Sequence, residues 1–159
     1  MAEKYLVVFD TVTLVQSLIN PDGPAGKCFA YFEQGKISVA LSRDTLAEIR
    51  EVLTRPHLRN RFRQLTDRKA AELVAVLTYR GYYLRRVGQH YSYPRDPDDE
   101  PYLNLAIEVE ADYLISRDHD LLDLMKWEQE EGRTFQRRFH FLKIVTPIEF
   151  LNVMESQGR

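Results

Sequence analysis

Acidic side chains stand at the points where two apolar segments of this sequence end. Asp10 follows the apolar segment Tyr5–Phe9, and Asp118 lies just past the segment Tyr113–Ser116. A third acid, Asp99, comes directly before a segment in which apolar residues recur at helical spacing. Parallel strands carry functional groups at their carboxyl ends, so strands over these segments would bring the acids to one edge of a sheet. Carboxylates that lie close together repel one another unless a cation lies between them, and oxygen ligands suit Mg²⁺ or Mn²⁺, so these acids predict a divalent-metal site.

A fourth acid, Glu48, lies inside a predicted helix on the flank of its apolar face. From there its carboxylate can face the edge of the sheet rather than bulk water. Three other acids stand close to a principal acid in the sequence and are secondary candidates for the metal: Asp96, Asp98 and Asp120. Each acid also has a structural interpretation, as a helix cap at Asp99, a turn residue at Asp118 or a solvated helix residue at Glu48. The coincidence of the set favours the metal site, as does the position of Asp10, where an acid has little structural purpose.

The elements that must position these acids alternate between strands and helices along the chain. Apolar segments predict strands over Tyr5–Phe9, Ile37–Leu41, Tyr82–Val87, Tyr113–Ser116 and Lys143–Val145. Apolar residues at helical spacing fill most of the chain between them, with Ser42 as a predicted N-cap and a capping-box pattern that begins at Thr146. The charged segment Trp127–Phe139 is predicted to be irregular or a helical extension. This alternation predicts an α/β domain with a mostly parallel sheet of about five strands and helices on both faces.

Length and composition are those of one soluble domain, which we expect to cover residues 1–159. The hydrophobic share is 44% and the charged share 29%, and no apolar segment approaches the ~20 residues that span a membrane. Cys28 is the only cysteine, which excludes an intrachain disulfide, and the first apolar segment is too short for a signal peptide. We therefore expect a cytoplasmic location. The net charge of −2 gives no overall attraction to nucleic acid, so an RNA partner would need a local basic patch.

Two clusters of basic residues could supply such a patch. Seven basic residues lie between Arg50 and Lys69 against two acids, and three more arginines follow in the segment Trp127–Phe139. The candidates for holding RNA phosphates are Arg55, Arg59, Arg63, Arg133, Arg137 and Arg138. A solvated helix surface is the alternative interpretation of each cluster. Four tyrosines could stack on bases or pack in the core, with core packing favoured: Tyr82, Tyr83, Tyr91 and Tyr93. The four histidines have no metal-binding spacing.

Several motifs together resemble one known family, the PIN domains. The segment Val7–Leu14 is similar to the opening strand and first acid of these domains, and Ser42–Pro56 resembles the segment that holds their second acid. The segments Arg95–Ala106 and Ala111–Leu122 resemble the third-acid and fourth-acid motifs of a subgroup, the toxin components of toxin–antitoxin systems, and Thr146–Leu151 resembles the closing segment. The resemblance therefore covers nearly the whole chain.

The resemblance implies a three-layer α/β/α fold and a metal-dependent ribonuclease. It assigns catalysis and the binding of Mg²⁺ or Mn²⁺ to Asp10, Glu48, Asp99 and Asp118. It also makes Ser116 a supporting hydroxyl, and it implies RNA as substrate, a cognate antitoxin as partner and a homodimer. Two positions depart from the pattern, because Val12 replaces the usual Asn and Arg117 replaces the usual Gly. The Arg117 side chain could crowd the metal or bind a phosphate.

Two other functions remain as alternatives. The first is a PIN fold that binds RNA or a protein through a weakened active site, which the changes at Val12 and Arg117 favour. The second is a phosphatase of the haloacid-dehalogenase type, which also places a nucleophilic Asp at the end of a parallel strand. That class needs a second acid two residues further on, where this chain has Val12.

Overall fold

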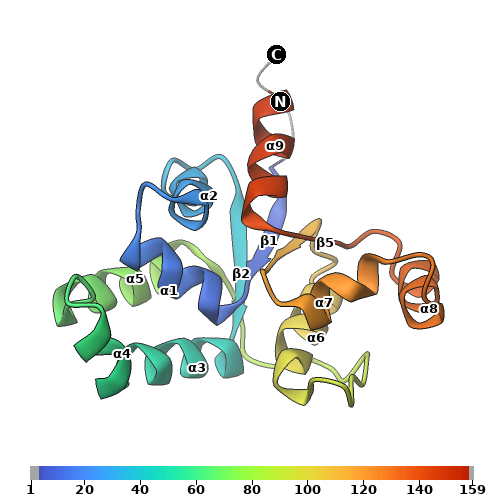
Figure 1. Ribbon diagram of the computed structural model, residues 1–159, viewed down its shortest axis with the longest axis horizontal. Helices are drawn as coiled ribbons and strands as arrows, with labels where there is room; N and C mark the ends of the chain where they lie inside the picture. Colours follow the sequence, from blue (N-terminus) through green and yellow to red (C-terminus); the bar gives the residue numbers. More distant parts are fainter. Residues whose placement is uncertain (1–3, 158–159) are drawn as a thin grey trace.

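The predicted strands form one parallel sheet in the computed structural model, which describes residues 4–157. The strands are β1 (Leu6–Phe9), β2 (Ser38–Ser42), β3 (Tyr82–Leu84), β4 (Tyr113–Ile115) and β5 (Lys143–Val145). Their order in the sheet is β3-β2-β1-β4-β5, and every neighbouring pair is parallel. The chain therefore winds outward from the central strand β1 in both directions (Figure 1).

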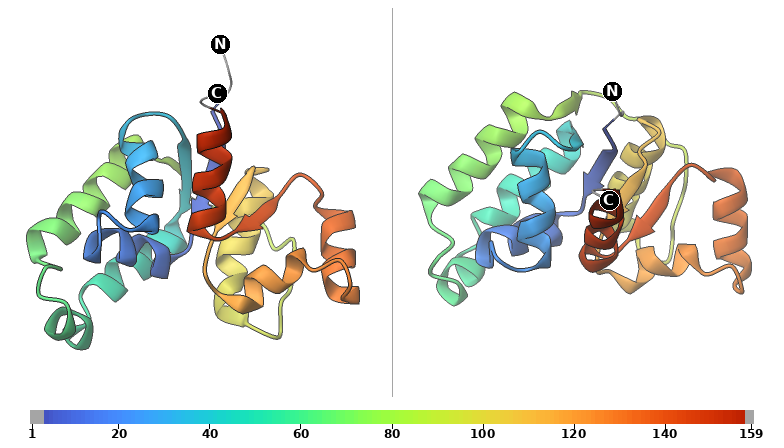
Figure 2. Two further views of the ribbon diagram at one scale, coloured as in Figure 1. Left: turned by 45° about the horizontal axis from the view of Figure 1, so that its top comes forward. Right: turned by 90° about the horizontal axis from the view of Figure 1, so that it is seen from above.

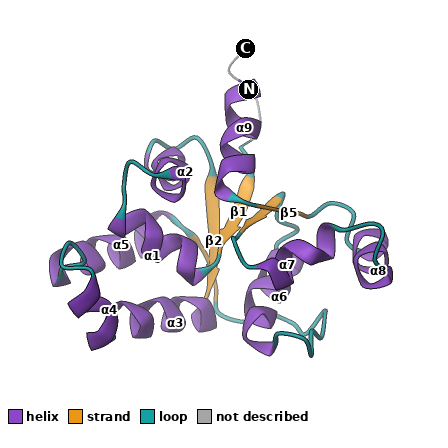
Figure 3. Cartoon of the chain, in the orientation of Figure 1, coloured by secondary structure: helices purple, strands orange, loops and turns teal. Residues whose placement is uncertain are grey.

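Helices cover both faces of this sheet (Figures 2 and 3). They are α1 (Thr11–Ile19), α2 (Pro24–Glu33), α3 (Arg43–Leu53), α4 (Pro56–Arg61), α5 (Asp67–Arg80), α6 (Glu100–Glu108), α7 (His119–Leu122), α8 (Glu130–Arg138) and α9 (Pro147–Gln157), with short 3-10 helices at Pro97–Asp99 and Asp123–Met125. Successive residues of a strand point to opposite faces. Accordingly, Val7 and Phe9 pack with buried residues of α1, α2, α3, α5 and α9, whereas Val8 packs with those of α6, α7 and α8. This arrangement confirms the three-layer α/β/α fold.

The ends of several elements differ from the sequence-based expectation, most of all at the third strand. The strand predicted over Tyr82–Val87 ends at Leu84, because Leu84 pairs with Ser42, the last residue of β2, and no partner strand continues beyond it. Most of the segment Trp127–Phe139 is the helix α8, so of the two predicted alternatives the helical one is confirmed. The prediction of one domain over residues 1–159 extends to terminal residues outside the described range. No helix among residues 4–157 combines the length and the apolar composition that crossing a membrane requires.

Capping hydrogen bonds fix the first turns of two helices, α3 and α9, of which α3 carries Glu48. Ser42 and Thr45 form a reciprocal capping box at the start of α3, in which the Thr45 N–H donates to Ser42 Oγ at 3.1 Å. Thr146 and Glu149 form the predicted box at the start of α9, with bonds of 3.0 and 3.1 Å. Since α1 and α3 begin directly after β1 and β2, their first turns lie at the carboxyl edge of the sheet.

Candidate metal-binding active site

All four principal acids line one pocket of about 410 Å³ at the carboxyl edge of the sheet. The lining residues are Asp10, Thr11, Val12, Glu48, Asp96, Asp98, Asp99, Tyr102, Arg117 and Asp118. They come from the ends of β1 and β4, from α1, α3 and α6, and from the 3-10 helix Pro97–Asp99. The structure therefore brings together acids that are far apart in the sequence. Of the secondary candidates, Asp96 and Asp98 line this pocket and Asp120 does not.

Three of the carboxylates crowd together on one side of the pocket. One oxygen of each of Asp96, Asp99 and Asp118 lies within 4.8 Å of the others. The 3-10 helix explains the pairing of the first two, because residues three apart eclipse one another in a 3-10 turn, and the Asp99 N–H donates to the Asp96 carbonyl at 3.2 Å. Sequence alone favoured Asp99 over its two neighbours, whereas the structure puts Asp96 beside it.

Asp99 is the most deeply buried member of this cluster. Its side chain is only 9% exposed, and its Oδ2 is buried without a hydrogen-bond partner among the described residues. Burial, together with the neighbouring carboxylates of Asp96 and Asp118, raises the pKa of Asp99 to about 9. Three negative charges in this space need a proton or a cation between them. An oxygen-only cluster with an unpartnered buried oxygen fits a hard divalent cation such as Mg²⁺ or Mn²⁺.

Asp10 lies beside this cluster and is held by its neighbours. One carboxylate oxygen accepts from the Thr13 N–H at 2.9 Å, which makes Asp10 the N-cap of α1, and the other accepts from the Ser116 hydroxyl. The expectation that an acid here has little structural purpose was therefore wrong. Burial raises the pKa of Asp10, and the hydrogen bonds from Ser116 and Thr13 partly offset this effect. Ser116 also accepts from the Asp118 N–H at 2.9 Å, so this fully buried hydroxyl links two of the acids.

Glu48 lies across the pocket, and two hydroxyl groups hold its carboxylate. Glu48 Oε2 accepts from the Thr11 hydroxyl at 3.0 Å and from the phenol of Tyr102. Burial, followed by the hydrogen bond to Glu48, raises the pKa of Tyr102, so the phenol remains a donor at neutral pH. Sequence analysis missed both residues. Their signals were the place of Thr11 directly after Asp10 and the spacing of three residues between Asp99 and Tyr102 at the start of a helix.

Removing the hydroxyl of Tyr102 is expected to leave the Glu48 carboxylate less firmly held, because one of its two donors is lost. The change Tyr102→Phe keeps the ring in the core and deletes one donor, and comparable losses around metal ligands reduce metal affinity or activity by about 10–100-fold. Mn²⁺ titration calorimetry measures the effect. Tyr113→Phe, on β4 beside Tyr5, is the matched control and should bind Mn²⁺ as the wild type does. Wild-type affinity in Tyr102→Phe would show that the phenol only fills space.

The two positions that depart from the family pattern both line the pocket. Val12 is 60% exposed there and offers no polar group, and Arg117 is also exposed. Arg117 takes part in none of the ion pairs found among residues 4–157. Its guanidinium is thus free to meet an anion beside the acids. Asp120, in contrast, is paired with Arg95 at 2.7 Å.

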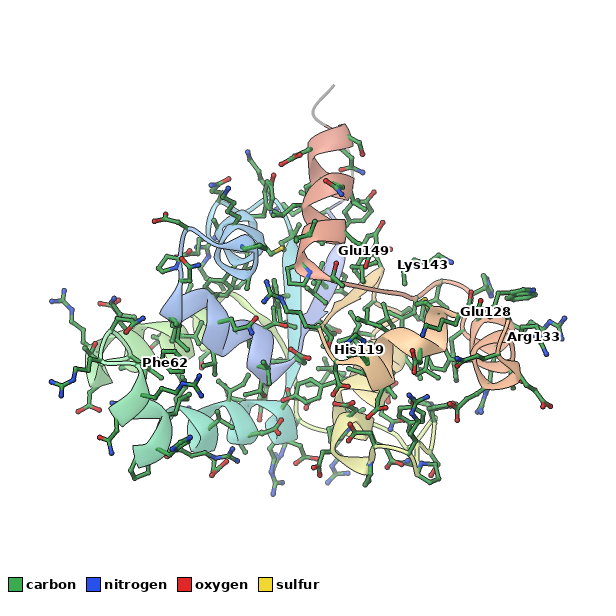
Figure 4. All side chains as sticks on the ribbon, in the orientation of Figure 1. Phe62, His119, Glu128, Arg133, Lys143 and Glu149 are labelled. Atoms are coloured by element: carbon green, nitrogen blue, oxygen red, sulfur yellow. The ribbon has the colours of Figure 1, made fainter. Side chains whose placement is uncertain are left out.

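The two predicted basic clusters lie on opposite sides of the molecule. Figure 4 shows Phe62, next to the first cluster, and Arg133, in the second, at its two ends. Several of these arginines already have partners. In the first cluster Arg55 pairs with Glu51 at 2.7 Å and Arg59 with Asp67 at 2.5 Å. In the second, Arg133 donates to the Trp127 carbonyl at 2.9 Å, Arg137 lies over the Trp127 ring, and Arg138 donates to the His90 carbonyl at 2.9 Å. Arg63 is exposed. The role of the clusters in RNA binding stays a prediction.

The candidate stacking tyrosines separate into two pairs. Tyr93 is fully buried and Tyr91 packs against the rings of Phe135 and Phe139, so both belong to the core. Tyr82 and Tyr83 on the edge strand β3 are 59% and 46% exposed. Core packing was therefore the correct interpretation for Tyr91 and Tyr93 and not for Tyr82 and Tyr83.

The parallel sheet, with carboxylates gathered at its carboxyl edge, places the protein among the α/β proteins whose site is built from acidic side chains. Within that class the chain belongs to the PIN-domain family, whose pattern matches residues 6–120, a range that contains all four principal acids. PIN domains are generally nucleases that act on RNA and typically use divalent metals. The chain is also 31% identical to the uncharacterized protein MJ1680 of Methanocaldococcus jannaschii over 157 residues, which cover 96% of this chain and 94% of that protein.

Proposed function

We propose that this protein hydrolyses phosphodiester bonds within RNA strands, with Mg²⁺ or Mn²⁺ held by Asp10, Glu48, Asp99 and Asp118. The observation that carries the proposal is the unpartnered buried Oδ2 of Asp99 inside the crowded carboxylate cluster. A carboxylate in that position is costly in the absence of a cation. Asp96 is a further candidate ligand because its carboxylate belongs to the same cluster.

Different residues of the chain would have different roles in such a reaction. When bound, a divalent cation lowers the pKa of a water molecule and offsets the negative charge that develops on the phosphate. The Ser116 hydroxyl holds Asp10 in place, and Thr11 and Tyr102 hold Glu48, so these acids need little rearrangement. Any acid that is not occupied as a ligand can accept a proton from the attacking water. Arg117 is placed to bind a non-bridging phosphate oxygen.

The finer role of toxin rests on the resemblance of the third-acid and fourth-acid motifs to those of toxin components. Under that role a cognate antitoxin protein would bind the chain and a homodimer would form. MJ1680 is itself uncharacterized, so its likeness supports the family and not the role. The toxin activity, the antitoxin and the homodimer stay predictions.

A second candidate function is binding of RNA or protein without cleavage. The exposed apolar side chain of Val12 at the pocket favours it, because a polar residue there would help to order the site. The phosphatase alternative loses its support, because the chain belongs to the PIN family and has no acid two residues after Asp10.

Cleavage of single-stranded RNA separates these candidates. End-labelled RNA of mixed sequence should be cut at internal positions in Mn²⁺ or Mg²⁺ and should stay intact in EDTA. Asp118→Asn, which keeps an acceptor oxygen for the Asp120 N–H but loses the charge, should reduce the rate at least ~100-fold. RNA that is bound but never cut, at any concentration of either metal, would favour the binding module instead.

A further inference from the structure

A second pocket, of about 240 Å³, adjoins the acid pocket. Arg117 lines both pockets, so they share one wall. The other polar or aromatic residues of the second pocket are Gln16 and Asn20 at the far end of α1 and Phe62 at the end of α4. None of the described residues that line it is an Asp or a Glu, whereas six acids line the first pocket. The two pockets therefore suit different parts of a ligand.

The exposed face of α1 joins the two pockets. Val12 lines the acid pocket, and Gln16 and Asn20, one and two turns further along the chain, line the second. Residues four apart share a face of a helix and are separated by roughly 6 Å along its axis. A chain molecule that lies along this face could place one unit in each pocket. The rise of roughly 6 Å from Val12 to Gln16 is on the scale of one nucleotide of an extended strand.

The chemistry of the second pocket matches a nucleobase. The Oε1 atom of Gln16 is buried and has no hydrogen-bond partner among the described residues. Each carboxamide side chain offers a donor and an acceptor, the combination that reads the edge of a base. The half-buried Phe62 ring offers a stacking surface, with the guanidinium of Arg61 5.3 Å from its centre. The pocket is smaller than the ~300–1,000 Å³ of sites for drug-sized ligands, so it suits one base and not a whole nucleotide.

We infer that this second pocket binds the base of a nucleotide adjacent to the phosphodiester bond held at the acids. Phe62 stacks on the base, Gln16 and Asn20 bind its edge, and Arg117 binds the phosphate between the two pockets. The inference rests on the proposed function for the identity of the ligand, a single RNA strand. It adds a source of base preference that the acid pocket by itself does not supply.

Binding of short RNA in EDTA tests this inference without cleavage. Fluorescein-labelled five-nucleotide strands of uridine, adenosine or cytidine, and an abasic strand of equal length, are titrated with protein and followed by anisotropy. Phe62→Ala should weaken binding of the base-containing strands at least ~5-fold, the lower range of base–aromatic stacking, and leave the abasic strand unchanged. Gln16→Ala should change the ratio of affinities for the three base-containing strands. Arg117→Gln should weaken all four strands to a similar extent.

The controls separate this inference from the proposed function. Gln34→Ala makes the same change at an exposed residue at the end of α2 and should bind every strand as the wild type does. If Phe62→Ala proves unstable on thermal melting, Gln16→Ala is the variant that tests base-dependent binding. If the wild type cuts RNA but neither variant alters base-dependent binding, the second pocket is not a base site and the nuclease proposal stands. If base-dependent binding is lost in the variants but the wild type never cuts RNA, the base site stands and the nuclease proposal fails. A wild type that binds no strand overturns the inference.

Discussion

Asp10→Asn is expected to weaken Mn²⁺ binding by on the order of 100-fold or more, beyond the 10–100-fold typical of losing an outer-shell partner. The asparagine keeps the oxygen that accepts from the Thr13 N–H, and Asn caps helices about as well as Asp, so α1 should remain in place. What is lost is one negative charge facing the metal. Cleavage should fall at least as far as metal affinity, because the reaction needs the metal.

Isothermal titration calorimetry with Mn²⁺ measures this effect, and thermal melting checks the fold. Asp22→Asn is a matched control, because Asp22 is exposed and lines none of the pockets described above. It should bind Mn²⁺ with wild-type affinity. Equal affinity in Asp10→Asn and the wild type would remove Asp10 from the metal site and leave it only as the cap of α1.

The metal-free protein is expected to lose stability as the pH rises from about 4 to about 9. The pKa of Asp99 is about 9 in the folded protein, against an ordinary value of 3.8. Between these values the folded protein retains a proton that the unfolded chain has released. The free energy of unfolding therefore falls with pH, by at most about 1.4 kcal/mol per pH unit for each such proton. The raised pKa of Asp10 acts in the same direction.

Urea denaturation in EDTA at a series of pH values measures this slope. Asp99→Asn should make it shallower, because the titrating group is gone, and Asp118→Asn should also do so by removing a charge that raises the pKa of Asp99. At pH 8 the metal-free Asp118→Asn protein should melt no lower than the wild type. Asn keeps the oxygen that caps α7, so a much lower melting temperature would mean that the charge of Asp118 itself stabilises the fold. Mn²⁺ should reverse the slope, because its ligands bind it in the deprotonated form.

Local sequence patterns were enough to predict most of the strands and helices and the edge of the sheet at which the acids lie. The apolar segments that end near Asp10 and Asp118 predicted strands, and the alternation of strands with helices predicted a parallel sheet. The caps at Ser42 and Thr146 were also predicted, since a capping bond joins residues three apart and needs no tertiary contact. In each case the physical cause is local: hydrophobic periodicity, backbone geometry and neighbouring side chains. The direction of parallel strands then fixed the common edge.

Which polar groups meet at that edge depends on contacts between segments far apart in the sequence. The hydroxyls of Thr11 and Tyr102 meet at Glu48, although Glu48 and Tyr102 are 54 positions apart, and no local pattern encodes that contact. The carboxylates of Asp96 and Asp99 meet that of Asp118 only because the segment before α6 lies beside the end of β4, and Asp120 is turned to Arg95, 25 positions away. The end of β3 depends likewise on the length of its partner β2. Contacts between distant segments form only when the two layers of helices close on the sheet, because the buried area that favours them exists only in the assembled core.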